Sequence, residues 1–203
     1  MVSLMPPMRT AGGRRQEALL PLLEQTRIIP AVRAPGLLTC AATAPGKMVY
    51  FLYGNPEDIA FMASVILAHG KTPILNLDLA SGFARDAPAI KFLARRGVQG
   101  ILSTHQEPLR AARKLGLFAI ERTFLIDSAA LQSILHSLDH FLPDALEILP
   151  AMAAPRIISR LQQLYPALPV VAGGLIQSLR ETEELIRQGV TSVSASDFHL
   201  WVA

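Results

Sequence analysis

Two runs of small residues near the end of the chain have the composition of a phosphate-binding site. Gly173 and Gly174 follow an apolar run rich in β-branched residues, and Ser178 then stands where it can cap a helix. The pattern recurs where a second strand-like run is followed by Ser194 and Ser196. Backbone N–H groups in such turns can approach phosphate oxygens, and the positive end of a helix dipole favours the anion. A tight turn without a ligand is the alternative interpretation.

Polar or charged residues also stand where other apolar, strand-like runs end. They are Arg33, Asp78, Ser103, Arg122 and Glu147. In a parallel (β/α)8 barrel the C-terminal ends of all strands meet at one face, where ligand-binding groups gather. Glu147 has apolar neighbours, and because burying a lone carboxylate is costly, it needs a cation or hydrogen-bond donors. Arg33 and Arg122 can serve, and either can also bind a phosphate through two hydrogen bonds.

The two arginines and two carboxylates at the strand ends allow two interpretations. In the first, they form a structural network of ion pairs that closes the barrel. In the second, they line a pocket for a small polyol phosphate. The phosphate would then lie on the backbone near Gly174 and Ser196, and Asp78 and Glu147 would accept hydrogen bonds from hydroxyl groups.

Several other chemistries lack the residues that they need. No set of His, Cys, Asp and Glu has the spacing of metal ligands, so no metal ion is predicted. No lysine falls at a predicted strand end, which argues against a Schiff-base aldolase. The sequence contains no nucleophile elbow, Walker loop or dinucleotide fingerprint, and no cofactor is predicted.

Strand-like and helix-like runs alternate through most of the chain, which predicts an α/β fold. The predicted strands cover 28–32, 48–53, 72–77, 100–102, 117–120, 145–149, 169–172 and 190–193. The predicted helices cover 56–69, 87–96, 106–115, 128–141, 155–164 and 179–188, with a short one from Asp197. Asp127 precedes the helix over 128–141 and can cap it. This alternation predicts a single-domain (β/α)8 barrel of the TIM type, and an open doubly wound sheet is the main alternative.

The first part of the chain differs from the rest. We expect residues 1–26 to form a flexible arm with a short helix over 16–25, and residues 27–203 to form the barrel. Residues 1–27 hold four arginines and two glutamates, which accounts for +2 of the net charge of +3, so the barrel is nearly neutral despite a pI of 9.4.

Composition bounds the class of protein. Hydrophobic residues make up 51% of the chain and charged residues 17%, as in a globular domain with a sizeable core. No apolar run approaches the about 18 residues needed to span a membrane. The one cysteine, Cys40, cannot form an internal disulfide, and the first residues do not have the order of a secretory signal. We therefore expect a cytoplasmic protein without a membrane partner.

With these residues assembled, the chain resembles the glycerol-3-phosphate-responsive antiterminators, the glycerol uptake operon regulatory proteins of bacteria. The matching segments are 28–33, Asp78-Leu79 with Gly82, 100–104, Arg122 through Ser128, 147–150 and 172–176. The resemblance implies a (β/α)8-like barrel that binds glycerol 3-phosphate and acts on leader mRNA to prevent premature termination. It implies a regulator of transcription and not an enzyme.

The chain also departs from that family at several positions. The family often has a histidine where Asn76 stands and a basic residue where His105 stands. The turn after the last strand reads Ser194-Ala195-Ser196-Asp197, and a carboxylate there opposes a phosphate unless Asp197 caps the last helix and points away. The segment 34–47, rich in Ala, Pro and Gly, is also atypical. These departures bear on the ligand more than on the fold.

The densest basic group of the barrel is the candidate RNA site. It comprises Lys91, Arg95, Arg96, Arg110, Arg113 and Lys114, on two consecutive predicted helices. Consecutive helices are neighbours in this fold, so the six side chains can form one face that contacts RNA phosphates. The alternative is that cations in the last turn of a helix merely complement its dipole.

Three hypotheses for function follow. In the first, glycerol 3-phosphate binds at the C-terminal face, orders the loops, and the ordered state binds leader mRNA better, with a homodimer left open. The second is a sugar-phosphate isomerase or lyase with Asp78 or Glu147 as general base. The third is a barrel that binds the ligand but not RNA.

Overall fold

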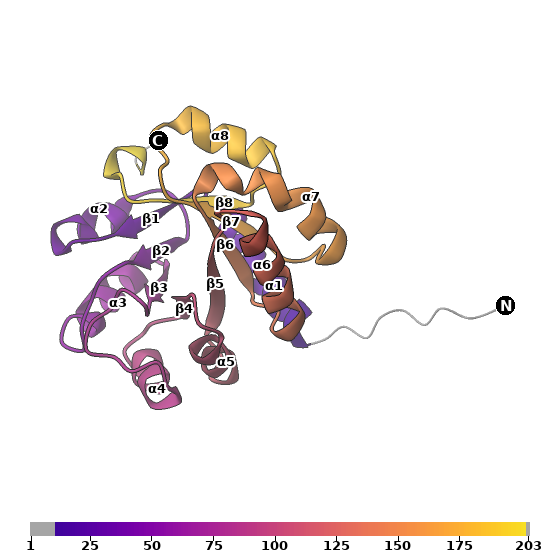
Figure 1. The fold of residues 1–203 in the computed structure, drawn as a ribbon. Coiled ribbons are helices and arrows are strands. Elements are labelled where there is room, and N and C mark those ends of the chain that lie inside the picture. Colours follow the sequence, from indigo (N-terminus) through magenta and orange to yellow (C-terminus); the bar gives the residue numbers. More distant parts are fainter. Residues whose placement is uncertain (1–10, 202–203) are drawn as a thin grey trace.

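The protein is a closed barrel of parallel strands surrounded by helices (Figure 1). The computed structural model describes residues 11–201, and each strand pairs in parallel with the next, with β1 pairing to β8. The strands are β1 Ile28–Val32, β2 Met48–Phe51, β3 Thr72–Asn76, β4 Gly100–Ser103, β5 Phe118–Phe124, β6 Ala145–Leu149, β7 Val170–Gly173 and β8 Ser192–Ala195. The predicted (β/α)8 barrel is confirmed, and the open sheet is excluded.

Most of the helices surround the strands, and three of them begin at a residue whose side chain caps the helix. The helices are α1 Ala11–Glu24, α2 Leu38–Thr43, α3 Ile59–Ala68, α4 Ala87–Arg95, α5 Gln106–Lys114, α6 Ser128–His140, α7 Pro155–Leu164 and α8 Leu179–Arg187. Short 3-10 turns cover Pro35–Leu37, Ala151–Ala153 and Phe198–Leu200. Side chains of Asp86, Asp127 and Ser178 accept hydrogen bonds from the first turns of α4, α6 and α8. The predicted caps of α6 and α8 are thus confirmed.

The beginning of the chain is more ordered than the sequence predicts. A helix already begins at Ala11, where the sequence predicts a flexible arm and a helix only from Gln16; residues 1–10 lie outside the described residues. Leu19 and Leu23 of α1 are fully buried and pack with the inward side chains of the barrel. Burying two leucines offsets the loss of chain entropy that ordering the helix requires.

Polar contacts show which end of the barrel α1 covers. The Arg15 guanidinium donates to the Leu117 carbonyl over 2.6 Å, and Gln16 donates to the Pro143 carbonyl over 3.0 Å. These carbonyls immediately precede β5 and β6, so α1 closes the N-terminal end of the barrel.

Two element boundaries differ from the prediction for local reasons. The turn Asn55–Asp58 precedes α3, because the Asn55 Oδ1 atom accepts from the backbone N–H groups of Glu57 and Asp58. The last strand begins at Ser192, because the Val190 N–H still bonds the Leu185 carbonyl at the end of α8. This shift places Ser194 within β8 and not in the turn after it.

No helix within residues 11–201 is long and apolar enough to cross a membrane.

Candidate functional site

The C-terminal face of the barrel contains a small cavity between the ends of β1, β2 and β5–β8. Its volume is about 160 Å3. It is lined by Ala31, Arg33, Leu52, Arg122, Leu149, Gly174, Leu175, Ile176, Ser194, Ala195, Ser196 and Asp197. This volume is well below the about 300–1,000 Å3 of drug-sized sites, and it suits a ligand of a few carbon atoms.

Arg33 and Ser196 join the first and last strands at one side of this cavity. The Arg33 Nε atom donates to the Ser196 hydroxyl oxygen over 2.8 Å. Both residues follow the strands that close the barrel, since β1 pairs with β8. The exposed guanidinium keeps its two Nη groups for a further acceptor, and a planar guanidinium suits the oxygens of a phosphate.

The turn after β7 has the backbone expected of a ligand-binding loop. Gly174 and Leu175 have φ angles of 80° and 62°, both in the left-handed region. A leucine held there is strained by about 1 kcal/mol or more, and such strain is concentrated at ligand-binding loops. The Leu175 side chain is exposed, so its burial does not explain the strained conformation.

Gly173, at the end of β7, leaves room for a polar cluster beneath the cavity. A Cβ atom there would lie 2.5 Å from the Ser194 hydroxyl oxygen and 3.0 Å from the Glu147 Oε1 atom. Gly173 therefore allows β7 to approach these side chains closely. Gly173 does not line the cavity itself but leaves space for the Ser194 and Glu147 side chains next to it.

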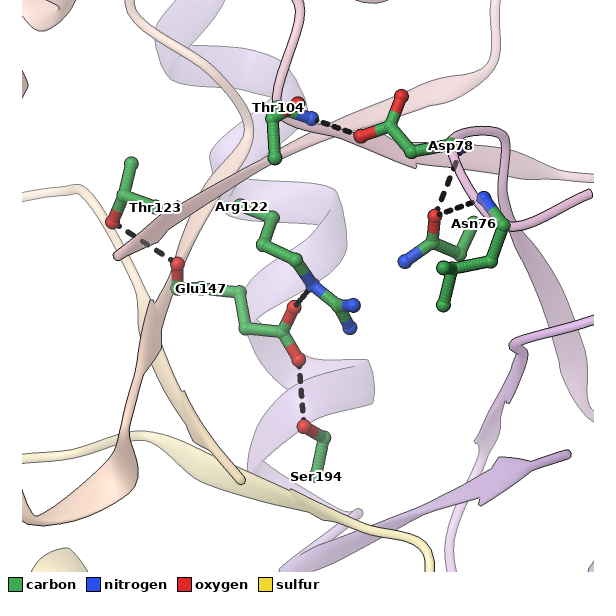
Figure 2. A network of polar contacts seen from close by, with 8 residues as sticks. Asn76, Asp78, Thr104, Arg122, Thr123, Glu147 and Ser194 are labelled. Carbon is green, nitrogen blue, oxygen red and sulfur yellow. Dashed lines mark hydrogen bonds and ion pairs between the residues drawn. The ribbon is translucent and has the colours of Figure 1, made fainter. Parts of the chain in front are cut away.

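The polar cluster centres on the fully buried Glu147. One carboxylate oxygen accepts from the Arg122 Nε atom over 2.5 Å, and the other accepts from the Ser194 hydroxyl over 2.6 Å (Figure 2). Arg122 lies in the middle of β5, which is longer than predicted, and its side chain is almost fully buried. The ion pair is thus formed inside the barrel and holds the Arg122 side chain at the cavity.

Asp78 and Ser103 lie apart from this cluster, at the ends of β3 and β4. The Asp78 carboxylate accepts from the Ser103 hydroxyl over 2.8 Å and from the Thr104 N–H over 2.6 Å, and lies 3.4 Å from the Arg85 Nε atom. Partial burial raises the pKa of Asp78, but the bonds from Thr104 and Ser103 outweigh it and hold that pKa below its usual value. Asp78 therefore joins the loops that lead into α4 and α5.

Asp197 lines the cavity but is engaged by the backbone that follows it. Its Oδ1 atom accepts from the His199 N–H over 3.0 Å, which caps the short 3-10 turn Phe198–Leu200. The expected capping role is thus observed, but Asp197 does not point away from the cavity, since it is one of the lining residues.

The structure thus distributes the predicted ligand-binding residues over three places. Arg33, Arg122, Gly174, Ser194 and Ser196 line the cavity. Glu147 and Gly173 do not line the cavity but contact Ser194, which does. Asp78 and Ser103 are hydrogen-bonded to each other at the ends of β3 and β4. The four charged residues do not form one network, since Arg33 pairs with a serine and Asp78 with Arg85. Their contact with a ligand stays a prediction.

Tyr50 and Asn76 are not among the ligand-binding residues predicted from the sequence. Both side chains are buried in the barrel, and Tyr50 is the polar-tipped aromatic of an otherwise apolar β2. A polar atom within an apolar strand is the signal that could have identified Tyr50.

The cations of the predicted RNA site differ in their contacts with the rest of the protein. Lys91, Arg110 and Lys114 line a broad groove of about 870 Å3 between α4 and α5. Arg110 also donates to the His140 carbonyl and Arg113 to the Leu142 carbonyl, and both guanidinium groups lie over the Phe141 ring. Arg113 in particular is half-buried, so its contacts are with the protein itself.

Comparison with known proteins extends over nearly all of the described chain. The family described as "Glycerol-3-phosphate responsive antiterminator" matches residues 28–201. The protein YgcP of Escherichia coli (strain K12) is 31% identical over 184 residues, which are 90% of this chain and 95% of YgcP.

Two solved structures share the fold. A glycerol uptake operon antiterminator-related protein from Thermotoga maritima MSB8 has a TM-score of 0.78 and 25% identity, over 87% of this chain and 98% of that one. The glycerol uptake operon antiterminator regulatory protein of Listeria monocytogenes str. 4b F2365 has a TM-score of 0.79 and 29% identity, over 87% of this chain and 95% of that one. The resemblance seen in the sequence is confirmed: the chain belongs to the glycerol-3-phosphate responsive antiterminator family.

Proposed function

We propose that the protein binds glycerol 3-phosphate at the C-terminal face of the barrel and that the bound form then binds leader mRNA of glycerol-utilisation genes. It would act there as a transcription antiterminator, in the cytoplasm where that mRNA is made. Besides the family match, the observation that carries the proposal is the small cavity between Arg33, Arg122 and the turn at Gly174.

The chemistry of this cavity suits a phosphate monoester. A phosphate monoester carries a charge of about −1.5 to −2 at pH 7, and two guanidinium groups with adjacent serine hydroxyls supply donors for its oxygens. The Glu147 carboxylate neutralises part of the Arg122 charge, so Arg33 and the backbone at Gly174 bind the phosphate most directly. The remaining space at the barrel axis then receives the polyol.

We expect glycerol 3-phosphate to bind at least about tenfold more tightly than glycerol, because charge-assisted hydrogen bonds to the phosphate are lost with glycerol. Isothermal titration calorimetry at pH 7 measures both affinities. An Arg33→Gln variant should lose most of this difference, whereas Arg180→Gln on the exposed face of α8 should keep it. Equal affinity of the two compounds for the wild-type protein would contradict a phosphate site.

The proposed coupling to RNA runs through Asp78. Its carboxylate joins the loop before α4 to the loop before α5, and those two helices carry the groove lined by Lys91 and Lys114. A ligand that binds the ordered loops better than the open ones shifts the protein towards the ordered state. The difference between its affinities for the two states sets the limit on that shift.

RNA binding should depend on Lys91 and Lys114, which line the groove with exposed ammonium groups. We expect the double variant Lys91→Glu with Lys114→Glu to lose at least about tenfold in RNA affinity and to bind glycerol 3-phosphate normally. The measurement is a gel shift with leader mRNA, with and without ligand, at several salt concentrations.

The matched control makes the same charge change elsewhere. Arg160→Glu with Arg180→Glu alters two exposed arginines on α7 and α8 and should keep RNA binding. If both double variants bind RNA equally well, the RNA site is elsewhere on the protein. If wild-type protein binds the ligand but no RNA under any condition, the third hypothesis, a ligand-binding barrel without RNA activity, is correct.

A homodimer would appear in the same gels as a complex of higher stoichiometry.

The contacts of the two carboxylates do not favour an isomerase or lyase. A general base works best with a pKa near the operating pH, but the hydrogen bonds to Asp78 lower its pKa. Both oxygens of Glu147 already accept hydrogen bonds from protein donors. All four lysines of the chain lie away from the C-terminal strand ends, and the buried Lys71 donates to carbonyls of Ala41 and Ala44. We therefore propose a regulator and not an enzyme.

A further inference from the structure

Two hydrogen-bonding groups inside the barrel have no partner within the described residues. They are the hydroxyl of Tyr50, whose residue is 0% exposed, and the Nδ2 group of Asn76, whose residue is 1% exposed. Leaving a buried donor unpaired costs about 1–3 kcal/mol, and most such groups in folded proteins do have partners. The two groups therefore need an acceptor that the protein does not supply.

The orientation of the Asn76 side chain is fixed by its other end. The Oδ1 atom accepts from the Asp78 N–H over 3.0 Å and from the Leu79 N–H over 3.2 Å. Only an oxygen can accept these bonds, so the amide nitrogen must lie on the inner side. In Figure 2 this nitrogen points toward the guanidinium group of Arg122. Both groups are donors, so they cannot bond each other, and an acceptor placed between them would satisfy both.

Tyr50 lies in the same region. Burial raises the pKa of its phenol well above the usual value, the Glu147 charge raises it further, and the Arg122 charge lowers it. The phenol therefore keeps its proton at neutral pH and remains a donor. Tyr50 stands two residues before Leu52 on the same inward face of β2. Leu52 lines the cavity and Tyr50 does not, so the buried phenol lies one layer below the cavity.

The charges near Tyr50 and Asn76 favour a neutral hydrogen-bond acceptor over an anion. Glu147 already neutralises part of the Arg122 charge, and its two oxygens accept hydrogen bonds from Arg122 and Ser194. A second anion would find no uncompensated cation here, whereas a hydroxyl oxygen can accept from an amide and a phenol without added charge. The groups that bind anions lie further out, at Arg33 and Gly174.

We propose that Tyr50 and Asn76 bind a hydroxyl oxygen of the ligand's polyol chain at the barrel axis, while its phosphate lies at the outer end of the cavity. This inference rests on the proposed function and specifies its ligand class. The class is phosphate monoesters of short polyols, and esters that lack the recognised hydroxyl are discriminated against. A site with polar groups left unpaired rejects such analogues more strongly than an apolar site does.

The test combines one variant with three ligands. Tyr50→Phe removes the hydroxyl at nearly constant volume, and calorimetry compares glycerol 3-phosphate with 3-hydroxypropyl phosphate and 2-hydroxypropyl phosphate, each of which lacks one hydroxyl. We expect the variant to bind glycerol 3-phosphate about three- to tenfold more weakly. It should bind one of the two analogues as the wild-type protein does, because that analogue lacks the recognised hydroxyl.

Thermal unfolding without ligand separates this role from a structural one. Removing an unpaired buried hydroxyl should leave the melting temperature of Tyr50→Phe unchanged or higher. The matched control is Tyr165→Phe, whose hydroxyl donates to Asp139 over 2.6 Å outside the barrel. That variant should lose stability and keep its affinity for glycerol 3-phosphate, which is the opposite pattern.

A second variant tests Asn76 alone. Asn76→Asp keeps the Oδ1 bonds to the backbone of Asp78 and Leu79 but replaces the inner donor with an acceptor. It should also weaken glycerol 3-phosphate binding by at least about threefold. If both variants bind all three esters as the wild-type protein does, water fills this space and the inference is wrong. If the wild-type protein binds none of the esters, the proposed function fails and this inference with it.

Discussion

Replacing Glu147 with alanine is expected to lower the free energy of unfolding by about 3–5 kcal/mol, because it leaves Arg122 as an unpaired charge in the barrel. The carboxylate is fully buried and accepts from both Arg122 and Ser194, so its removal disrupts two hydrogen bonds at once. Urea denaturation of the variant and the wild-type protein measures the difference. Ligand affinity of the folded fraction should fall as well, because Arg122 is no longer held at the cavity.

The double variant Arg122→Met with Glu147→Leu is the matched control for this loss. It removes the ion pair as a whole and should be more stable than Glu147→Ala alone, since no charge is left unpaired. A loss below about 1 kcal/mol for Glu147→Ala, together with weak ligand binding, would instead support direct contact between this carboxylate and a ligand hydroxyl.

Replacing Gly173 with alanine is expected to destabilise the protein by about 1–3 kcal/mol and to weaken glycerol 3-phosphate binding. The new Cβ atom would lie 2.5 Å from the Ser194 hydroxyl oxygen, closer than any real Cβ contact, and 3.0 Å from Glu147. Ser194 must therefore move, and its bond to Glu147 is lost. The same titration and denaturation experiments measure both effects.

Gly36→Ala provides the comparison for this variant. Gly36 lies in the first 3-10 turn, and no atom lies within 4 Å of the position of an added Cβ. This substitution should therefore leave affinity unchanged and stability the same or slightly higher. If Gly173→Ala behaves like Gly36→Ala, the close approach of β7 to Ser194 and Glu147 is not needed for the site.

The eight strands, most of the helices and their order could be predicted from the sequence, whereas the helix α2 over Leu38–Thr43 was not predicted. Alternating apolar runs and helix patterns are local signals, and so are the caps at Asp127 and Ser178, which is why these predictions are confirmed. The sequence also showed that polar residues stand at strand ends. In a parallel barrel such positions can only face the C-terminal end, so the location of the candidate site followed from the fold class.

The contacts within the site depend on how the strands are arranged around the barrel. The sequence offered Arg33 and Arg122 equally as partners for Glu147, but only Arg122 lies beside it, since β5 and β6 are neighbours in register. Barrel closure brings Arg33 to Ser196, 163 residues later. It also places the side chains of Tyr50 and Asn76 inside the barrel, where residues 11–201 supply no acceptor for the Tyr50 hydroxyl or the Asn76 Nδ2 group. Distances between side chains on different strands depend on strand register and barrel closure, which local composition does not encode.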